Sequence, residues 1–248
     1  MNLRQSLSSA LSPFLPEPFI RWYQRRTGHP NGQERFENLS LLETFSIVYR
    51  EGIWGQAAGQ GFYSGEGSED ELAVPYTAAI QGFLRQHGIR SVADLGCGDF
   101  RIGRRLSTLV DHYNGVDCVP ELIAHLSQTE AREGISFHCR DLTTDPLPPA
   151  GAALIRQVFQ HLSNREIASV LQQCAHYPFI IVTEHVPAGP CAHPNLDYPH
   201  GPNTRLVFDS GVFLDRPPFS RKSTVLLEIP YEGDTVIRTI AIDNRLSN

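Results

Sequence analysis

The stretch Ser91-Val-Ala-Asp-Leu-Gly-Cys-Gly-Asp-Phe100 decides the fold of this chain. Its apolar start predicts the end of a short buried strand, its middle predicts a glycine-bearing turn, and a helix is expected over about 101–110. Gly96 and Gly98 have no side chains, so the backbone can turn tightly and a ligand can approach it closely. The helix that follows presents free backbone N–H groups at its start. Strand, turn and helix in this order predict a site for a nucleotide-like ligand.

Length, composition and charge limit the classes of protein. With 248 residues, of which 41% are hydrophobic, the chain is long enough for one large α/β domain with an extension. A formal net charge of −6 disfavours a general nucleic-acid binder, which needs a basic face. The five scattered cysteines include no CxxC pair, which is typical of reduced thiols in a cytoplasmic protein. The polar N-terminus and the lack of a long apolar run predict no secretory signal and no transmembrane helix.

Hydrophobic periodicity and turn residues predict alternating strands and helices. After the opening strand, strands are expected at 113–117, 135–138, 152–156 and 178–183, and helices at 36–50, 68–87, 120–132 and 164–176. Two further strands, 223–229 and 235–242, flank a turn rich in breakers and predict an antiparallel hairpin. Ser68 and Asn164 are expected to cap their helices. The alternation predicts a mainly parallel sheet covered on both faces.

The N-terminal part differs from the rest of the chain. Residues 1–63 are predicted to form an arm and helical extension, and residues 64–248 the main domain. The segment Ile20-Arg-Trp-Tyr-Gln-Arg-Arg26 combines basic and aromatic side chains. It is expected either to pack on the main domain or to form an interface with a membrane surface or a partner. Local contact with nucleic acid is a third interpretation.

The order of the predicted strands and three acidic positions together resemble class I S-adenosylmethionine-dependent methyltransferases, over roughly residues 64–243. Asp94-Leu-Gly-Cys-Gly98 is similar to the Asp-x-Gly-x-Gly turn that holds the methionine end of the cofactor in that family. Asp117 stands where the family has the carboxylate that accepts both ribose hydroxyls, and Asp141-Leu142 where it contacts the adenine edge. The resemblance implies a Rossmann-like seven-stranded sheet with the last strand antiparallel and helices on both faces.

A dinucleotide site is the alternative for the glycine turn. The dinucleotide fingerprint G-x-G-x-x-G requires a third glycine, and Arg101 occupies that position here. Asp94 would also lie near a pyrophosphate and repel it, whereas it suits a cofactor with a cationic amino group. These charges favour S-adenosylmethionine over a nicotinamide dinucleotide.

Other positions extend the resemblance or depart from it. Trp54 and the turn around Gly65 and Gly67 are similar to a bacterial subgroup of class I methyltransferases, as is Val158-Phe-Gln-His-Leu162. Gln157 follows Arg156 where an Asp is expected, so an acidic catalytic role there is not available. The residues expected to bind the cofactor are Gly65, Gly67, Asp94, Gly96, Cys97, Gly98, Asp117, Cys118, Asp141, Leu142, Arg156 and Gln157.

Candidates for catalysis and for substrate binding follow the fourth and fifth strands. His161 and His185 are the expected catalytic residues, because a histidine can accept a proton from an acceptor hydroxyl. The long segment 187–219, rich in prolines, is expected to form part of the substrate wall. The residues expected to bind substrate are Trp54, Asn195, Asp197, Asn203 and Arg205. The group His185, Cys191, His193 and His200 lacks a standard zinc spacing, so no metal is expected.

The sequence therefore predicts an enzyme that transfers a methyl group from S-adenosylmethionine to a small polar molecule or glycan, at oxygen. A methyltransferase acting on protein or nucleic acid is the first alternative, although the acidic composition disfavours nucleic acid. A non-catalytic module that binds the cofactor is the second alternative, and the uncharged residues Gly151 and Gln157 are its support.

Overall fold

The computed structural model describes residues 30–55, 61–65, 67 and 69–246. The basic and aromatic segment 20–26 and the expected cap Ser68 lie outside these residues. The interface role of that segment and the domain boundary after residue 63 therefore stay predictions. Within the described part, no helix has the length and the apolar character that a membrane span requires.

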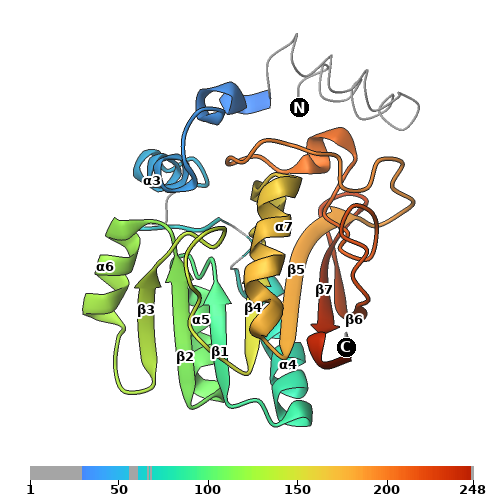
Figure 1. The fold of residues 1–248 in the computed structure, drawn as a ribbon. Coiled ribbons are helices and arrows are strands. Elements are labelled where there is room, and N and C mark those ends of the chain that lie inside the picture. The colour runs from blue at the N-terminus through green and yellow to red at the C-terminus, as the bar shows by residue number, and fades with distance from the viewer. Residues whose placement is uncertain (1–29, 56–60, 66, 68, 247–248) are drawn as a thin grey trace.

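A seven-stranded mixed sheet forms the centre of the molecule (Figure 1). Its order is β3-β2-β1-β4-β5-β7-β6, and the first five of these strands pair in parallel. β7 is antiparallel to both β5 and β6, which confirms the predicted topology. The strands are β1 Ser91–Leu95, β2 His112–Asp117, β3 Ile135–Cys139, β4 Ala152–Arg156, β5 Phe179–Pro187, β6 Thr224–Tyr231 and β7 Thr235–Asp243.

Helices cover the two faces of the sheet. The α-helices are α3 Leu41–Glu51, α4 Asp70–His87, α5 Arg101–Leu106, α6 Pro120–Thr129 and α7 Asn164–Gln173. The 3₁₀ turns are η2 Pro30–Phe36, η4 Ser107–Leu109, η5 Phe159–His161, η6 Cys174–His176, η7 Arg205–Phe208 and η8 Asn244–Leu246. Side chains of α4, α5 and α6 share one core cluster with Val92 and Leu154, and side chains of α7 share the other with Ala93 and Ile155. The alternation of a β-strand accounts for the two clusters, since successive side chains of β1 and β4 enter opposite faces.

Local sequence fixes where the helices begin. Ser163 is the N-cap of α7 and forms a capping box with Glu166, so the expectation that Asn164 caps this helix is wrong by one residue. α4 begins at Asp70 with Glu69 at its N-cap. The helix after the glycine turn is shorter than predicted, since it ends at Leu106 and continues only as the 3₁₀ turn η4.

Candidate active site

A cavity of about 390 Å³ opens at the carboxyl ends of β1, β2, β4 and β5. In open parallel sheets this edge is where ligands bind. Fourteen of the residues singled out from the sequence line it: Trp54, Gly65, Gly67, Asp94, Gly96, Cys97, Gly98, Asp117, Cys118, Leu142, Arg156, Gln157, His161 and His185. Asp141, Asn195, Asp197, Asn203 and Arg205 do not line it.

The glycine turn forms a cradle that side chains would fill. Gly96 and Gly98 have φ angles of 81° and 55°, a region that favours glycine. A Cβ atom at Gly96 would overlap the Val158 side chain, and one at Gly98 would overlap Ser64. Glycine is therefore required at both positions for the close packing of Val158 and Ser64 on the turn, and both glycines line the cavity.

Asp117, at the end of β2, has the geometry expected of a ribose acceptor. Its carboxylate is 9% exposed and accepts the N–H of Gly98 through Oδ2 and the N–H of Val119 through Oδ1, both at 3.2 Å. A carboxylate has about four acceptor positions, so each oxygen keeps a lone pair for a further donor. Burial raises the pKa of Asp117, and the backbone N–H bonds oppose that rise.

Asp94 is buried at the wall of the cavity, and two neighbouring side chains, Tyr113 and Arg156, interact with its carboxylate. The Tyr113 hydroxyl donates a hydrogen bond to Asp94 Oδ2. Burial raises the pKa of Asp94 to about 6, against the opposing effects of the Tyr113 bond and the Arg156 charge. Arg156 stacks over the ring of Tyr76 at 5.0 Å and donates to the carbonyl of Gly67. A cationic group in the cavity would therefore be attracted by the carboxylate of Asp94. The positive charge of Arg156 offsets part of the negative charge of Asp94 and so weakens this attraction.

Gln157 replaces the expected acidic residue and holds the loop over the cavity. It adopts a φ angle of 56°, its N–H donates to the carbonyl of Thr183 at 2.7 Å, and its Oε1 accepts from Arg156 Nη1 at 3.2 Å. A Cβ atom at Gly67 would overlap the Gln157 amide, so glycine is required for this close approach. The role of Gln157 visible here is to pack the Gly67 loop against β4.

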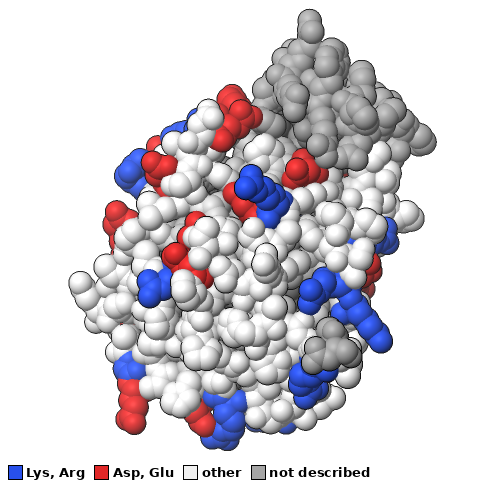
Figure 2. All heavy atoms as spheres, viewed as in Figure 1, with Lys and Arg blue, Asp and Glu red and all other residues white. Residues whose placement is uncertain are grey.

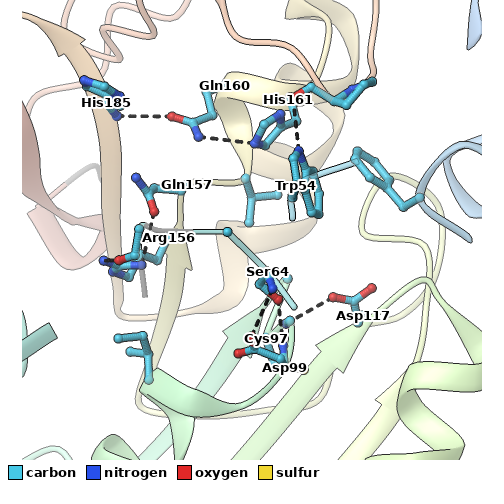
Figure 3. A pocket seen from close by; sticks show the side chains of 18 of the residues that line it. Trp54, Ser64, Cys97, Asp99, Asp117, Arg156, Gln157, Gln160, His161 and His185 are labelled. Carbon is cyan, nitrogen blue, oxygen red and sulfur yellow. Dashed lines mark hydrogen bonds between the residues drawn. The ribbon is translucent and has the colours of Figure 1, made fainter. Parts of the chain in front are cut away.

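A reciprocal clasp joins the 61–65 segment to the glycine turn. The N–H of Ser64 donates to Asp99 Oδ2 at 2.9 Å, and the N–H of Asp99 donates to Ser64 Oγ at 2.8 Å (Figure 3). The Tyr49 hydroxyl is 2.9 Å from the same Oγ. The local sequence does not reveal this clasp, because its two halves lie 35 residues apart.

The structure separates Asp141 from its neighbour Leu142. The Asp141 Oδ1 atom accepts from the N–H and the hydroxyl of Thr143 at 2.8 and 2.6 Å, so this carboxylate closes its own turn. Leu142 lines the cavity instead. The adenine-edge role expected for the Asp141 side chain is therefore not supported by its placement.

Four of the residues expected to bind substrate stabilise the segment between β5 and β6. Asn195 is 4% exposed and donates to the carbonyls of Phe213 and Pro217, and Arg205 is 1% exposed and donates to those of Leu196 and Leu162. Asp197 accepts the N–H of Asn164 at the start of α7, and Asn203 donates to Gln33. Because these side chains form hydrogen bonds within the protein, they stabilise this segment of the fold and do not face a substrate in the cavity.

His161, Gln160 and His185 form a connected group at the other end of the cavity (Figure 3). Gln160 Nε2 lies 3.2 Å from His161 Nε2, and Gln160 Oε1 accepts a hydrogen bond from the backbone N–H of His185 at 3.3 Å. Burial lowers the pKa of His161 and of His185 to about 4 in each case, so both rings are neutral at pH 7. The buried carboxylate of Glu184 accepts the N–H groups of Phe159 and Gln160, both at 2.9 Å, and holds the η5 turn in place.

Several lining residues were not identified from the sequence. They include Tyr49, Ser64, Asp99, Gln160, Thr204, Tyr231 and Glu232. For Gln160 the sequence held one usable signal, since this residue lies within Val158-Phe-Gln-His-Leu162, the motif that is similar to the bacterial subgroup. Tyr231 and Glu232 had none, since the turn of the β6–β7 hairpin is brought to the cavity by sheet order alone. Among the described residues, no three His, Cys, Asp or Glu side chains are grouped so as to hold a metal ion.

Comparisons with known proteins agree with this geometry. Residues 92–177 match the sequence model of a family described as a methyltransferase domain. No curated protein matches the sequence. Among solved structures, the chain is similar to a Leishmania major S-adenosylmethionine-dependent methyltransferase, with a TM-score of 0.55, 14% identity, and coverage of 86% of this chain and 91% of that one.

Two other solved structures show the same fold. Human N-acetylserotonin methyltransferase in complex with S-adenosylmethionine has a TM-score of 0.50 and 16% identity, over 90% of this chain and 66% of that one. The N-methyltransferase NodS from Bradyrhizobium japonicum has a TM-score of 0.50 and 11% identity, over 71% of this chain and 98% of that one. This chain thus spans slightly less than two thirds of the human enzyme's length.

Residues 92–177 are thus similar to a methyltransferase domain, and this stretch includes the glycine turn. The chain shares the fold of enzymes that use S-adenosylmethionine as their cofactor. That cofactor supplies an electrophilic methyl group on a sulfonium sulfur.

Proposed function

We propose that this enzyme transfers the methyl group to an oxygen atom of a small hydroxylated molecule, either a free polar compound or a glycan unit. The observation that carries the proposal is the arrangement of side chains along the cavity. Asp117 and the glycine turn lie at one end, and the group of Gln160, His161 and His185 lies at the other. A neutral histidine beside the acceptor site suits proton acceptance from a hydroxyl.

The residues of the cofactor end fit S-adenosylmethionine. The open lone pairs of Asp117 suit two ribose hydroxyls, the acidic Asp94 suits the ammonium of the methionine part, and the bare backbone at Gly96 and Gly98 admits close approach. We assign the cavity-lining residues in these roles and leave Asp141 out, since its carboxylate closes its own turn.

A small acceptor is favoured over a macromolecule by the shape and charge around the site. The acceptor end is enclosed by α3, the η5 turn and the β6–β7 hairpin. Figure 2 shows Lys and Arg side chains and Asp and Glu side chains in small separate groups on an otherwise uncharged face. A methyltransferase acting on protein or nucleic acid remains the alternative that the following experiment separates.

The test supplies S-adenosylmethionine with a labelled methyl group to the enzyme and a cell extract, then divides the products by size. We expect the label in the small-molecule fraction, in an alkali-stable ether. The Asp117→Ala variant should incorporate at least tenfold less label, because two charge-assisted hydrogen bonds to the cofactor are lost. Label recovered in protein or nucleic acid would contradict the proposal.

A further inference from the structure

Four side chains form a continuous wall at the acceptor end of the cavity. His185, Gln160, His161 and Trp54 follow one another across the upper part of Figure 3. The centroids of the Trp54 and His161 rings are 5.0 Å apart. Because all four line the cavity, this wall faces whatever acceptor binds beside the cofactor.

Most polar atoms of this wall already bond to protein. His161 Nδ1 lies 3.1 Å from the carbonyl of Gly201, so Nδ1 carries the proton and Nε2 accepts from the Gln160 amide at 3.2 Å. The indole N–H of Trp54 donates to the carbonyl of Pro202 at 3.1 Å. His161 and Trp54 therefore offer an acceptor their ring surfaces and no free nitrogen.

Two more rings extend the apolar part of the wall. Phe45 and Tyr49 of α3 lie 5.9 and 5.6 Å from the Trp54 ring, measured between centroids, and both line the cavity. The Tyr49 hydroxyl is occupied by Ser64. The resulting surface of three rings suits a flat apolar body, because aromatic groups pack favourably in offset or edge-to-face arrangements.

His185 is the exception, since one of its ring nitrogens is open. The Thr235 hydroxyl donates to the carbonyl of Glu232 at 2.8 Å, which leaves its oxygen to accept from His185 Nε2 at 2.7 Å. This arrangement puts the ring proton on Nε2 and leaves a lone pair on Nδ1. Within the part of the chain that the structure describes, no group bonds to that Nδ1 atom.

We infer that the acceptor is a small aromatic molecule bearing a hydroxyl, whose ring lies against Trp54 and whose hydroxyl bonds to His185 Nδ1. The inference rests on the proposed methyl transfer to oxygen and narrows its substrate class. A glycan would bring several hydroxyls against a wall whose nitrogens are mostly taken, and each unpaired hydroxyl weakens binding. A saturated alcohol would lose the ring contacts with Trp54.

The transfer step then needs one proton acceptor. A lone pair of the acceptor oxygen forms the new bond to the methyl carbon, and the carbon–sulfur bond breaks with its electron pair going to sulfur. The hydroxyl proton passes to His185 Nδ1, which gives an imidazolium that returns the proton to water. An aromatic hydroxyl is a far stronger acid than an aliphatic one, so a weakly basic histidine suffices for it and not for a sugar hydroxyl. Thr235 acts as a positioning residue for this base.

The test uses the full chain saturated with S-adenosylhomocysteine and three probes of increasing polarity: 1-naphthol, decahydro-1-naphthol and methyl β-glucoside. We expect calorimetry to show 1-naphthol binding at least tenfold more tightly than either saturated probe, and Trp54→Leu to abolish that preference. Equal binding of 1-naphthol and decahydro-1-naphthol, or tighter binding of the glucoside, would overturn the inference. Failure of S-adenosylhomocysteine itself to bind would instead overturn the proposed function.

The role of His185 has its own readout in the transfer of methyl from S-adenosylmethionine to 1-naphthol. His185→Leu should lower kcat at least tenfold while the affinity for S-adenosylhomocysteine stays within twofold. His185→Gln should be about as slow, because its amide oxygen can accept a hydrogen bond but cannot take up the proton. His112→Gln is the matched control, because His112 is an exposed histidine at the start of β2, the end of that strand opposite to Asp117. An unchanged kcat in His185→Leu would show that a group other than His185 accepts the hydroxyl proton.

The positioning role of Thr235 is measured without turnover. Ring ¹⁵N spectra of histidine-labelled protein should show His185 protonated at Nε2 in the wild type and in Thr235→Ser. Thr235→Val should give a mixture of both tautomers. A wild-type ring protonated at Nδ1, or no change in Thr235→Val, would contradict the assignment.

Discussion

At the scale of single residues, Gly96 is where backbone conformation and packing jointly restrict the sequence. Its φ angle of 81° and the overlap of an added Cβ with Val158 predict that Gly96→Ala loses about 2–4 kcal/mol of unfolding free energy. Gly82→Ala is the control, because Gly82 lies within α4 with open space around it and should gain about 0.5–1 kcal/mol. Denaturant unfolding measures both. Similar changes in the two variants would show that the turn is not constrained.

Asp94 makes cofactor binding depend on pH. Its pKa is raised to about 6 by burial, so its carboxyl becomes neutral as the pH falls below 6 and no longer attracts the cofactor's ammonium. The dissociation constant of S-adenosylmethionine should therefore rise by up to about tenfold per pH unit below 6. Titration calorimetry at a series of pH values from 7 to 5 checks this. Asp94→Asn should bind more weakly at pH 7 and show a flatter profile, and an equally steep profile in that variant would exclude Asp94 as the cause.

Residue types alone could not distinguish binding residues from residues that hold loops. Asn195 and Arg205 have the chemistry of ligand-binding side chains, and their sequence context is an irregular loop. Each is buried by contacts with carbonyls far along the chain, from Phe213 for Asn195 and from Leu162 for Arg205. Such partners depend on the tertiary fold, so the local sequence does not reveal them. The position of Asp117 in the cavity lining was predictable, because its place at a strand end is a local feature of the sequence.

At the scale of elements, the start of α7 connects this helix, which covers one face of the sheet, to the η5 turn, which carries Gln160 and His161 of the acceptor site. The capping box of Ser163 and Glu166 lies at the start of this helix, and its N-cap Ser163 is two residues after His161. Ser163→Ala should cost about 1 kcal/mol of unfolding free energy, because the N–H of Glu166 loses its partner. Ser169→Ala is the control within the same helix. Ser169 is half-buried and its hydroxyl donates only to the carbonyl of Arg165, so the substitution should change stability by less than about 0.5 kcal/mol. Thermal unfolding compares them, and equal effects would refute the capping role.

Strands were predicted more closely than the segment that crosses them. β4 Ala152–Arg156 was predicted to the residue, since an apolar run between breakers has clear ends. β5 extends to Pro187, beyond the predicted end at 183, because its pairing with the antiparallel β7 continues through His185. The partner strand, which lies more than fifty residues further along the chain, determines that extension. The same sheet order brings the hairpin turn at Glu232 to the cavity.

At the scale of the whole molecule, Glu184 couples pH to stability. Burial raises its pKa from the ordinary 4.5 to about 8, although Phe159 and Gln160 donate to it and Arg205 lies near. The folded state therefore keeps a proton that the unfolded state releases, and this stabilising contribution is lost as the pH rises through 8. The lowered pKa values of His161 and His185 act only below about 6.5. The hydrogen bond to Glu166 raises the pKa of His200 above 6.5, so His200 adds to the fall in stability above that pH, and a variant of Glu184 is needed to separate the two groups.

The expected result is a fall of about 2 kcal/mol in unfolding free energy between pH 6.5 and 8. Glu184→Gln should remove most of that slope and leave the part that comes from His200, whereas Glu121→Gln, on the exposed side of α6, should keep all of it. Denaturant titrations at four pH values give the comparison. A slope that survives in Glu184→Gln would assign the effect to another group.

The central claim is that the edge of the sheet at Asp117 holds S-adenosylmethionine, and calorimetry with S-adenosylhomocysteine tests it most directly. Asp111 immediately precedes β2 and Asp117 ends it, so Asp111→Ala, which removes only an exposed ion pair with Arg90, is a matched control. The account predicts that Asp111→Ala binds like the wild type and that Asp117→Ala binds about 30–1000-fold more weakly, from the loss of two charge-assisted hydrogen bonds. No binding by the wild type, or equal binding by both variants, would contradict it.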